Sequence, residues 1–452
     1  MTMRLLLLVA VAALSSAASA NPQPTLDAVL QARIAESETP ACVAVGVVGE
    51  QPRTAFGCTS EAGKVTIDEN SIFEIGSITK GFTGIILADM VLKGEVNLDD
   101  PAAKYARPGA KLPTRDGREI TLRHLVTHTS SLPRLPPGFK PTNPRDPYST
   151  FDADALYEAL ARTDLARDIG TSSEYSNFGF MWLSEMLARR AGKSYAALLL
   201  ERITVPLGMT STFVVVPPAL QSRFVTGHGP DYQPVAHWEI PGDLAGVGLV
   251  RSSLADMMRL AEALSGRRST PLDKAIALAV EPLHRLGDPS QNVGYAWQMR
   301  DRESRRTYSH GGGTGGFTSM IAFERDKKTA AVVLVDATTS FADLAVHLVD
   351  PDFPLSKKRV ALVTDAALRQ QYVGNYELRP NFVITVFEDG DRLMARATSQ
   401  SAAEVFRHGT DSFFYRVVDA RLTFTRDKEG KVDGLVLNQG GRAMPAKRVA
   451  SP

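Results

Sequence analysis

Ser77 and Lys80 are the first residues whose types and spacing suggest a catalytic role. They lie in FEIGSITKGFTGIILADM (73–90), where a glycine precedes the serine and an apolar stretch follows the lysine. A serine hydroxyl becomes an effective nucleophile only when a base takes its proton. In a helix that begins near Ser77, Lys80 lies one turn further along the same face, so its amine can reach the hydroxyl. Burial and a neighbouring cation would lower the pKa of Lys80 and leave part of the amine neutral.

Tyr175 and Asn177 offer two further polar groups. They stand in SSEYSNFGF, a polar turn before an apolar stretch. A tyrosine oxygen near a lysine can carry a proton, and an asparagine amide can hold both a lysine and a substrate carbonyl. The alternative is a buried tyrosine followed by an asparagine that caps a helix.

A glycine-rich segment, SHGGGTGGF (309–317), lies between two strand-like runs. Glycines let a substrate approach the backbone closely, and free N–H groups there can bind an oxyanion. The candidate substrate-binding residues of this segment are His310, Gly311, Gly312 and Gly313. The segment also spells G-x-G-x-x-G, but a dinucleotide site requires a helix next. The residues that follow predict strands instead, so we expect no nucleotide cofactor.

Other catalytic patterns are weaker. His124 and His128 stand four residues apart in HLVTH, but a metalloprotease helix would carry glutamate where Leu125 stands. We therefore interpret both histidines as structural and predict neither a metal nor any other cofactor. The sequence contains no G-x-S-x-G elbow, which argues against an α/β-hydrolase.

The two cysteines, Cys42 and Cys58, flank a predicted β-hairpin whose turn is Gly49-Glu50-Gln51-Pro52 (residues 49–52). In such a hairpin the two side chains face each other. In an oxidising compartment they would form a disulfide worth up to roughly 3 kcal/mol. Two buried free thiols are an equally acceptable interpretation.

The chain of 452 residues is too long for one ordinary core. Strand signals near residues 41–59 and again beyond 292 enclose a region that is mostly helical from 151 to 264. We therefore predict an α+β (α/β sandwich) fold, with an antiparallel sheet built from both ends of the catalytic domain and an inserted helical lobe. The predicted divisions are a signal peptide (1–20), a hydrolase domain (21–350), a linker (351–360) and a small C-terminal β-rich domain (361–452). Within the last, a helix is expected over 361–372 and a hairpin around Asp389-Gly390 (residues 389–390).

The N-terminus has the pattern of an export signal. Arg4 precedes LLLLVAVAAL, an apolar run too short to span a bilayer, and small residues follow at 18–20. The mature protein is expected to begin near Asn21 and to be periplasmic or secreted, without a transmembrane segment. A formal net charge of +1 provides no basic field, so nucleic acid is not an expected partner. The oligomeric state stays open.

These motifs, in this order, resemble those of the serine β-lactamase and penicillin-binding protein superfamily. EIGSITKGFTG, followed by GEVNLDDPAAKY and ITLRHLVTHTSSLP, looks most like the class C β-lactamases and their relatives. Those relatives are D-alanyl-D-alanine carboxypeptidases, D-aminopeptidases and family VIII esterases. The resemblance covers roughly residues 25–345, and the C-terminal part is similar to the β-barrel-like accessory domains of some of these hydrolases.

The resemblance implies a role for each motif residue. Ser77 would be acylated, Lys80 and Tyr175 would together handle its proton, and Asn177 would orient Lys80 and the substrate amide. The oxyanion hole would consist of the backbone N–H groups of Ser77 and Gly313. The substrate would be small or peptidoglycan-like.

The third motif departs from the family pattern. His310-Gly311-Gly312 (310–312) stands where class C enzymes usually have Lys-Thr-Gly. A histidine carries its charge only part of the time near neutral pH, so we expect weaker recognition of a β-lactam carboxylate. The sequence thus predicts an exported serine hydrolase of β-lactams or D-alanyl amides. The alternatives are a family VIII-like carboxylesterase, a non-hydrolytic penicillin-binding sensor, and an unrelated structural protein.

Overall fold

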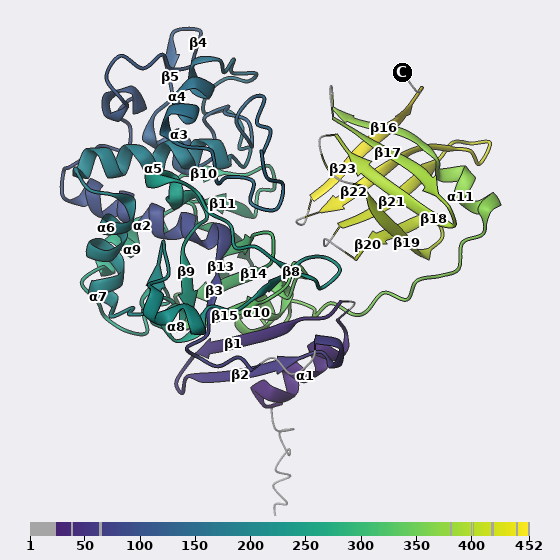
Figure 1. Ribbon diagram of the computed structural model, residues 1–452, viewed down its shortest axis with the longest axis horizontal. Coiled ribbons are helices and arrows are strands. Elements are labelled where there is room, and N and C mark those ends of the chain that lie inside the picture. Colours follow the sequence, from purple (N-terminus) through teal and green to yellow (C-terminus); the bar gives the residue numbers. More distant parts are fainter. Residues whose placement is uncertain are drawn as a thin grey trace, which may run out of the picture.

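The computed structural model describes residues 24–37, 39–62, 66–379, 382–398, 400, 402–416, 420–439 and 442–450. The predicted signal peptide lies outside these ranges. The described chain forms a large body of helices and sheet followed by a small barrel, with an extended segment joining the two (Figure 1). None of the described helices is both long and apolar enough to cross a membrane.

An eight-stranded antiparallel sheet organises the large body. Its strands, from edge to edge, are β10 (His284–Arg285), β11 (Gln291–Val293), β12 (Gln298–Arg302), β13 (Arg305–Gly313), β14 (Thr318–Glu324), β15 (Thr329–Val335), β1 (Cys42–Val48) and β2 (Arg53–Cys58). The pairing of β1 with β15 aligns Val43 with Val335, so the two ends of the large body meet within one sheet, one strand in from its edge. This confirms the predicted sheet built from both ends.

Side-chain alternation along β1 and β15 gives the sheet two apolar faces. Val43 and Val45 pack on one face with α1 (Leu26–Ala35) and α10 (Ala342–Val349). Ala44 and Val332 belong to a second and larger core on the other face, which α8 (Leu254–Leu264) and the helical lobe cover. Because both faces are buried, β1 and β15 are nearly continuous apolar runs.

The helical lobe is inserted between β2 and β10, as predicted. Its helices are α2 (Thr79–Leu92), α3 (Leu122–Val126), α4 (Ala153–Ala161), α5 (Asn177–Ala191), α6 (Tyr195–Leu199), a π-helical stretch (Leu200–Thr204), α7 (Val205–Leu207), α8 and α9 (Asp273–Ala279). Short 3-10 turns cover Ser60–Ala62, Gly76–Ile78, Ala102–Tyr105, Pro218–Arg223 and Gly242–Val247. Ser253 caps α8, since its side chain accepts a hydrogen bond from the Asp256 N–H.

Three small sheets complete the lobe. They are β3 (Ile72–Glu74) with β9 (Arg251–Ser253) and β6 (Thr212–Phe213), β4 (Thr114–Arg115) with β5 (Arg118–Glu119), and β7 (Gly227–His228) with β8 (Pro234–Val235). The first of them leads directly into the turn that carries Ser77, because β3 ends at Glu74.

The predicted hairpin forms, with β1 and β2 paired so that Cys42 lies directly opposite Cys58. The two cysteines are joined by a disulfide that closes a loop of 16 residues. It ties the edge strand β2 to its neighbour β1.

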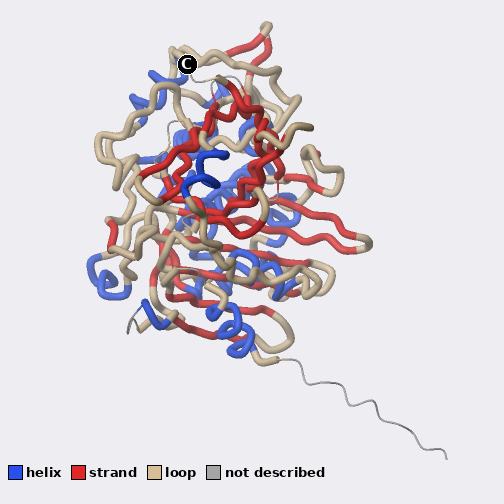
Figure 2. Tube along the Cα trace, turned by 90° about the vertical axis from the view of Figure 1, so that its right-hand side faces the viewer, coloured by secondary structure: helices blue, strands red, loops and turns tan. Residues whose placement is uncertain are grey.

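The C-terminal part is a closed barrel, which agrees with the expected β-barrel-like fold (Figure 2). Its strands are β16 (Gly374–Arg379), β17 (Phe382–Asp389), β18 (Arg392–Ala397), β19 (Ala403–Gly409), β20 (Ser412–Tyr415), β21 (Ala420–Arg426), β22 (Val432–Gln439) and β23 (Arg442–Val449). The helix expected over 361–372 is shorter, because α11 (Ala366–Tyr372) begins only after Asp365 caps it. The expected turn follows β17, with Gly390 at a positive φ of 65°.

Candidate active site

Ser77 lies in the 3-10 turn Gly76–Ile78, immediately before α2. The helix predicted to begin near Ser77 therefore begins two residues later, at Thr79. Gly76 has a positive φ of 50°, and a Cβ added to it would lie 2.4 Å from the Gly313 nitrogen. Only glycine therefore allows β13 to approach the turn this closely. Ser77 is partly exposed, so a substrate can reach its hydroxyl.

Lys80 is completely buried in the first turn of α2. Its Nζ lies 3.1 Å from the Ser77 Oγ and donates a hydrogen bond to the Val247 carbonyl at 2.6 Å. Burial, and to a smaller extent the positive charge of Arg134, hold the pKa of Lys80 well below its usual value. The predicted lowering of this pKa is confirmed, and it favours the neutral form of the amine that faces the serine hydroxyl.

Tyr175 lies in the loop before α5, and its ring packs against the Lys80 amine. The Lys80 Nζ lies 4.8 Å from the centroid of the Tyr175 ring. Burial raises the pKa of Tyr175 to about 12, and an interaction with the Ser77 side chain only partly opposes this rise. The phenol is therefore protonated when the lysine is neutral.

Asn177 is the first residue of α5, and its neighbour Ser176 caps the helix. Its side chain interacts with Tyr148. Its Oδ1 is buried and has no hydrogen-bond partner among the described residues. Because the hydrogen bonds of Lys80 go to Ser77 and Val247, the expected orientation of Lys80 by Asn177 is not seen here.

His310 differs from the expectation of a partly charged residue. It is 2% exposed on β13, and its Nδ1 lies 2.8 Å from the Gly311 carbonyl oxygen. Burial first, and then the charge of Lys80, lower the pKa of His310 to about 4. The imidazole is therefore neutral near pH 7, and this motif provides no fixed positive charge for a substrate.

The glycines of β13 form a wall beside Ser77. A Cβ added to Gly312 would lie 2.0 Å from the Ile75 carbonyl oxygen, which also accepts a hydrogen bond from the Ser319 hydroxyl at 2.8 Å. Backbone therefore packs on backbone between β13 and the Ser77 turn. The strand β14 follows this segment, so the helix that a dinucleotide site needs is absent there.

His128 belongs to this cluster, although sequence reasoning assigned it only a structural place. Its ring stacks on Tyr175 with a centroid distance of 4.5 Å, and its Nδ1 accepts a hydrogen bond from the Ser176 N–H at 3.1 Å. Burial, and then the charges of Lys80, His310 and Arg134, hold the pKa of His128 well below its usual value. A neutral His128 thus fixes the loop that carries Tyr175.

His124 lies apart from this cluster. Its Nδ1 accepts a hydrogen bond from the Thr121 N–H at 3.1 Å and so closes the capping box of α3. His128 stands beyond the end of α3, so the two histidines do not share a helix face. In the described parts of the chain, no group of three or more His, Cys, Asp or Glu residues is arranged to hold a metal ion.

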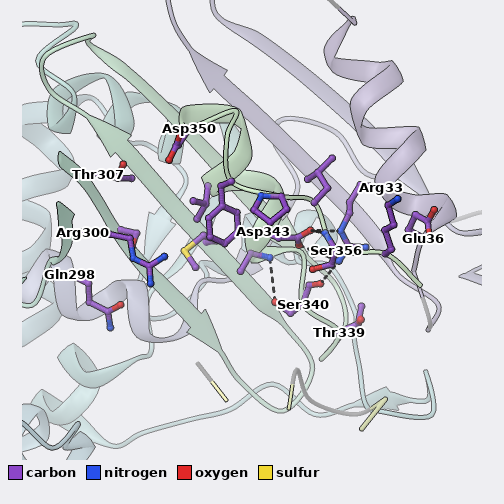
Figure 3. Close-up of a pocket in the computed structure, with 18 of the residues that line it drawn as sticks. Arg33, Glu36, Gln298, Arg300, Thr307, Thr339, Ser340, Asp343, Asp350 and Ser356 are labelled. Carbon is purple, nitrogen blue, oxygen red and sulfur yellow. Dashed lines mark hydrogen bonds and ion pairs between the residues drawn. The ribbon is translucent and has the colours of Figure 1, made fainter. Parts of the chain in front are cut away.

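A cavity of about 650 Å³ lies on the other face of the sheet (Figure 3). Thr307 and Ser309 line it, and alternation along β13 directs them away from the face that carries His310. Its wall also includes the ion pair between Arg33 and Asp343, with an N···O distance of 2.7 Å. None of the residues around Ser77 lines this cavity, so it is separate from the site described above.

The sheet, the lobe and the cluster of Ser77, Lys80 and Tyr175 are those of a serine hydrolase. Residues 26–349 match the family model described as Beta-lactamase, and the chain belongs to this family. Residues 358–447 match a domain of unknown function (DUF3471), which accounts for the barrel.

Curated relatives agree with this membership. The D-alanyl-D-alanine-carboxypeptidase/endopeptidase AmpH of Escherichia coli K12 is 32% identical over 62% of this chain and 75% of its own length. Penicillin-binding protein 4* of Bacillus subtilis is 24% identical over 85% of this chain and 90% of its own length. The Beta-lactamase of Escherichia coli K12 is 26% identical over 65% of this chain and 83% of its own length.

Solved structures support the fold. A beta-lactamase/D-alanine carboxypeptidase from Yersinia pestis, complexed with citrate, has a TM-score of 0.61 and 24% identity, covering 71% of this chain and 95% of its own. A class C beta lactamase from Rhodobacter sphaeroides has a TM-score of 0.58 at 24% identity, covering 70% and 94% of the two chains.

Proposed function

We propose that this protein is an exported serine hydrolase that forms an acyl-enzyme on Ser77 and cleaves a D-alanyl amide or a β-lactam. The observation that carries the proposal is the buried Lys80, whose Nζ lies 3.1 Å from the Ser77 hydroxyl oxygen and whose pKa is lowered. Such an amine can take the proton of the hydroxyl during attack on a carbonyl carbon.

Lys80 and Tyr175 differ in protonation state before the reaction, so each takes a different part in proton transfer. Lys80, neutral, accepts the Ser77 proton while the Oγ bonds to the carbonyl carbon. Tyr175, protonated because its pKa is raised to about 12, donates its proton to the leaving nitrogen as the amide bond breaks. The proton on Lys80 then restores the phenol. Water completes the cycle by attacking the acyl group and returning a proton to the Ser77 oxygen.

The backbone around Ser77 is the proposed oxyanion hole. The N–H groups of Ser77 and Gly313 would hold the oxygen of the tetrahedral intermediate, because β13 packs directly on the Ser77 turn at Gly76. His310, Gly311 and Gly312 would form the adjoining wall. Asn177, with its unpartnered Oδ1, would accept a hydrogen bond from the substrate amide.

Export is part of the proposal. The pattern of residues 1–20 is typical of a signal peptide, and a Cys42–Cys58 disulfide suits an oxidising compartment. Cell fractionation together with N-terminal sequencing of the mature protein tests this. A mature N-terminus near Asn21 in the periplasmic or secreted fraction is expected, whereas an uncleaved cytoplasmic product would contradict it.

A substrate panel tests the chemistry. Nitrocefin, an acyl-D-alanyl-D-alanine peptide and p-nitrophenyl esters are each compared between the wild type and Ser77→Ala. Turnover of the peptide or nitrocefin that disappears in Ser77→Ala supports the proposal, with the acyl group detected on Ser77 by mass spectrometry. Turnover of esters alone would make the protein a carboxylesterase, and a stable penicillin adduct without turnover would make it a sensor.

A further inference from the structure

The site described above lacks a cation that a substrate carboxylate can reach. His310 is buried with a pKa of about 4, and Lys80 is completely buried with its Nζ already engaged by Ser77 and Val247. A D-alanyl-D-alanine carboxypeptidase must nevertheless recognise the free carboxylate that lies one residue, about 3.8 Å of chain, beyond the bond it cleaves. The question is which positively charged side chain near Ser77 the substrate carboxylate can reach.

Arg134 packs against the ring of Tyr175, as Lys80 also does. Its guanidinium carbon is 5.2 Å from the centroid of the Tyr175 ring, compared with 4.8 Å for the Lys80 Nζ. Unlike Lys80, Arg134 is exposed to solvent. Within the described parts of the chain its side chain forms no ion pair, so its donors are available to a ligand.

The loop that carries Arg134 is fixed to the Tyr-Ser-Asn motif. The Arg134 carbonyl accepts hydrogen bonds from the backbone N–H groups of Asn177 at 2.9 Å and Phe178 at 3.3 Å. The Ser176 hydroxyl donates a further hydrogen bond to the Pro133 carbonyl at 2.7 Å. Arg134 is therefore held at the start of α5 and is not carried by a freely moving loop.

The charge of Arg134 acts on the groups around the nucleophile. It contributes to the lowered pKa values of Lys80 and His128, and it opposes the rise in the pKa values of Tyr148 and Tyr175. Two of them, Lys80 and Tyr175, interact directly with the Ser77 side chain and so border the space next to it. A carboxylate in this space would therefore meet a positive potential whose exposed source is Arg134.

We infer that Arg134 is the residue that binds the substrate carboxylate, in place of the lysine that the third motif lacks. The inference rests on the proposed function and names its substrate class: peptides with a free C-terminal carboxylate, and β-lactams, which carry an equivalent one. The guanidinium offers a planar pair of N–H donors that matches a carboxylate. Arg134 is a specificity-determining residue and takes no part in proton transfer.

The test compares an acyl-D-alanyl-D-alanine peptide with the same peptide ending in a C-terminal amide. Both carry the same scissile bond, and only the first carries the negative charge. For the wild type we expect kcat/KM to favour the acid. In Arg134→Gln this preference should fall by roughly 10- to 100-fold, mostly through KM for the acid, and Arg134→Lys should restore part of it.

The ratio of the two peptides separates binding of the carboxylate from an indirect effect. Removing Arg134 also removes a charge that lowers the pKa of Lys80, which slows the reaction of both peptides equally and leaves their ratio unchanged. Arg53→Gln is the matched control, since it removes one exposed positive charge from the edge strand β2. It should leave the ratio as in the wild type.

Two different failures can be told apart. A wild type that acylates Ser77 with neither peptide and with no penicillin would remove the proposed function, and the carboxylate site with it. A wild type that cleaves both peptides equally well, or an Arg134→Gln variant that keeps the wild-type preference, would overturn the role of Arg134 and leave the serine chemistry intact.

Discussion

The buried His310 makes the stability of the catalytic part depend on pH in a way that His310→Gln should remove. The pKa of His310 is about 4 in the folded chain, against a usual value of 6.5. Between these two values the unfolded chain takes up a proton at this residue and the folded chain does not. The stabilising effect of a neutral His310 is therefore fully present above pH 6.5 and is lost as the pH falls toward 4.

The size of the effect follows from the two pKa values. Proton linkage gives a loss of about 2 kcal/mol in the free energy of unfolding between pH 7.5 and pH 5, and about 3 kcal/mol once the pH is below 4. The substitution also has a cost of its own, because it changes a buried side chain. That cost does not depend on pH. The pH dependence of the difference in free energy of unfolding between the wild type and His310→Gln therefore reports the protonation of His310 alone.

Tryptophan fluorescence during urea unfolding is the suitable assay. All three tryptophans, Trp182, Trp238 and Trp297, precede the barrel, so the signal reports the catalytic part alone. We expect the difference between the wild type and His310→Gln to change by about 2 kcal/mol between pH 7.5 and pH 5. His284→Gln is the control, since this histidine is only partly buried on β10 and a smaller change is expected.

A difference between the wild type and His310→Gln that stays constant from pH 7.5 to pH 5 would refute the reasoning. It would mean that the imidazole can be protonated in the folded site. In that case His310 would provide a charge to the substrate after all, and the need for Arg134 would disappear.

Three further predictions concern other parts of the site and sheet. Lys80→Arg keeps the charge but cannot supply a neutral amine, so the rate of Ser77 acylation should fall by roughly 10²- to 10⁴-fold; a rate near that of the wild type would exclude Lys80 as the base. Gly312→Ala should push β13 away from the Ser77 turn and reduce acylation by at least roughly 10-fold. Gly311→Ala should change the acylation rate little, because its added Cβ would make only ordinary van der Waals contacts, with the Met320 side chain at 3.4 Å and the Ser319 carbonyl oxygen at 3.7 Å. Equal rates for these two glycine variants would contradict the backbone-on-backbone packing. Reduction of the Cys42–Cys58 disulfide should lower the free energy of unfolding of the catalytic part by up to about 3 kcal/mol in the same fluorescence assay; unchanged unfolding in reductant would count against that contribution.

The hairpin and the sheet were predictable because local signals specify them. Alternation and a turn at 49–52 predicted β1 and β2, and the symmetry of that hairpin already placed Cys42 opposite Cys58. Strand signals at both ends of the domain predicted a sheet built from both ends, and the structure shows that β1 and β15 are the strands that join them.

The parts that sequence reasoning missed depend on burial and on distant contacts. The neutral state of His310 arises because β13 is covered on that face by the lobe, and no residue near it in the sequence reports this. Arg134 and Tyr175 are 41 positions apart, and their contact exists only once the loop before α4 is bound to the start of α5.

The pairing of Val43 with Val335 also has a consequence for biogenesis. The strand β1 has no neighbour on one side until nearly three hundred further residues have been synthesised, so the sheet cannot be completed before β15 is available. This delay suits a polypeptide that crosses a membrane in an extended state and folds afterwards. The end of α10 is held to β13 by Arg305, which binds the Val349 carbonyl and Asp350, so the barrel is attached on the face of the sheet opposite the nucleophile.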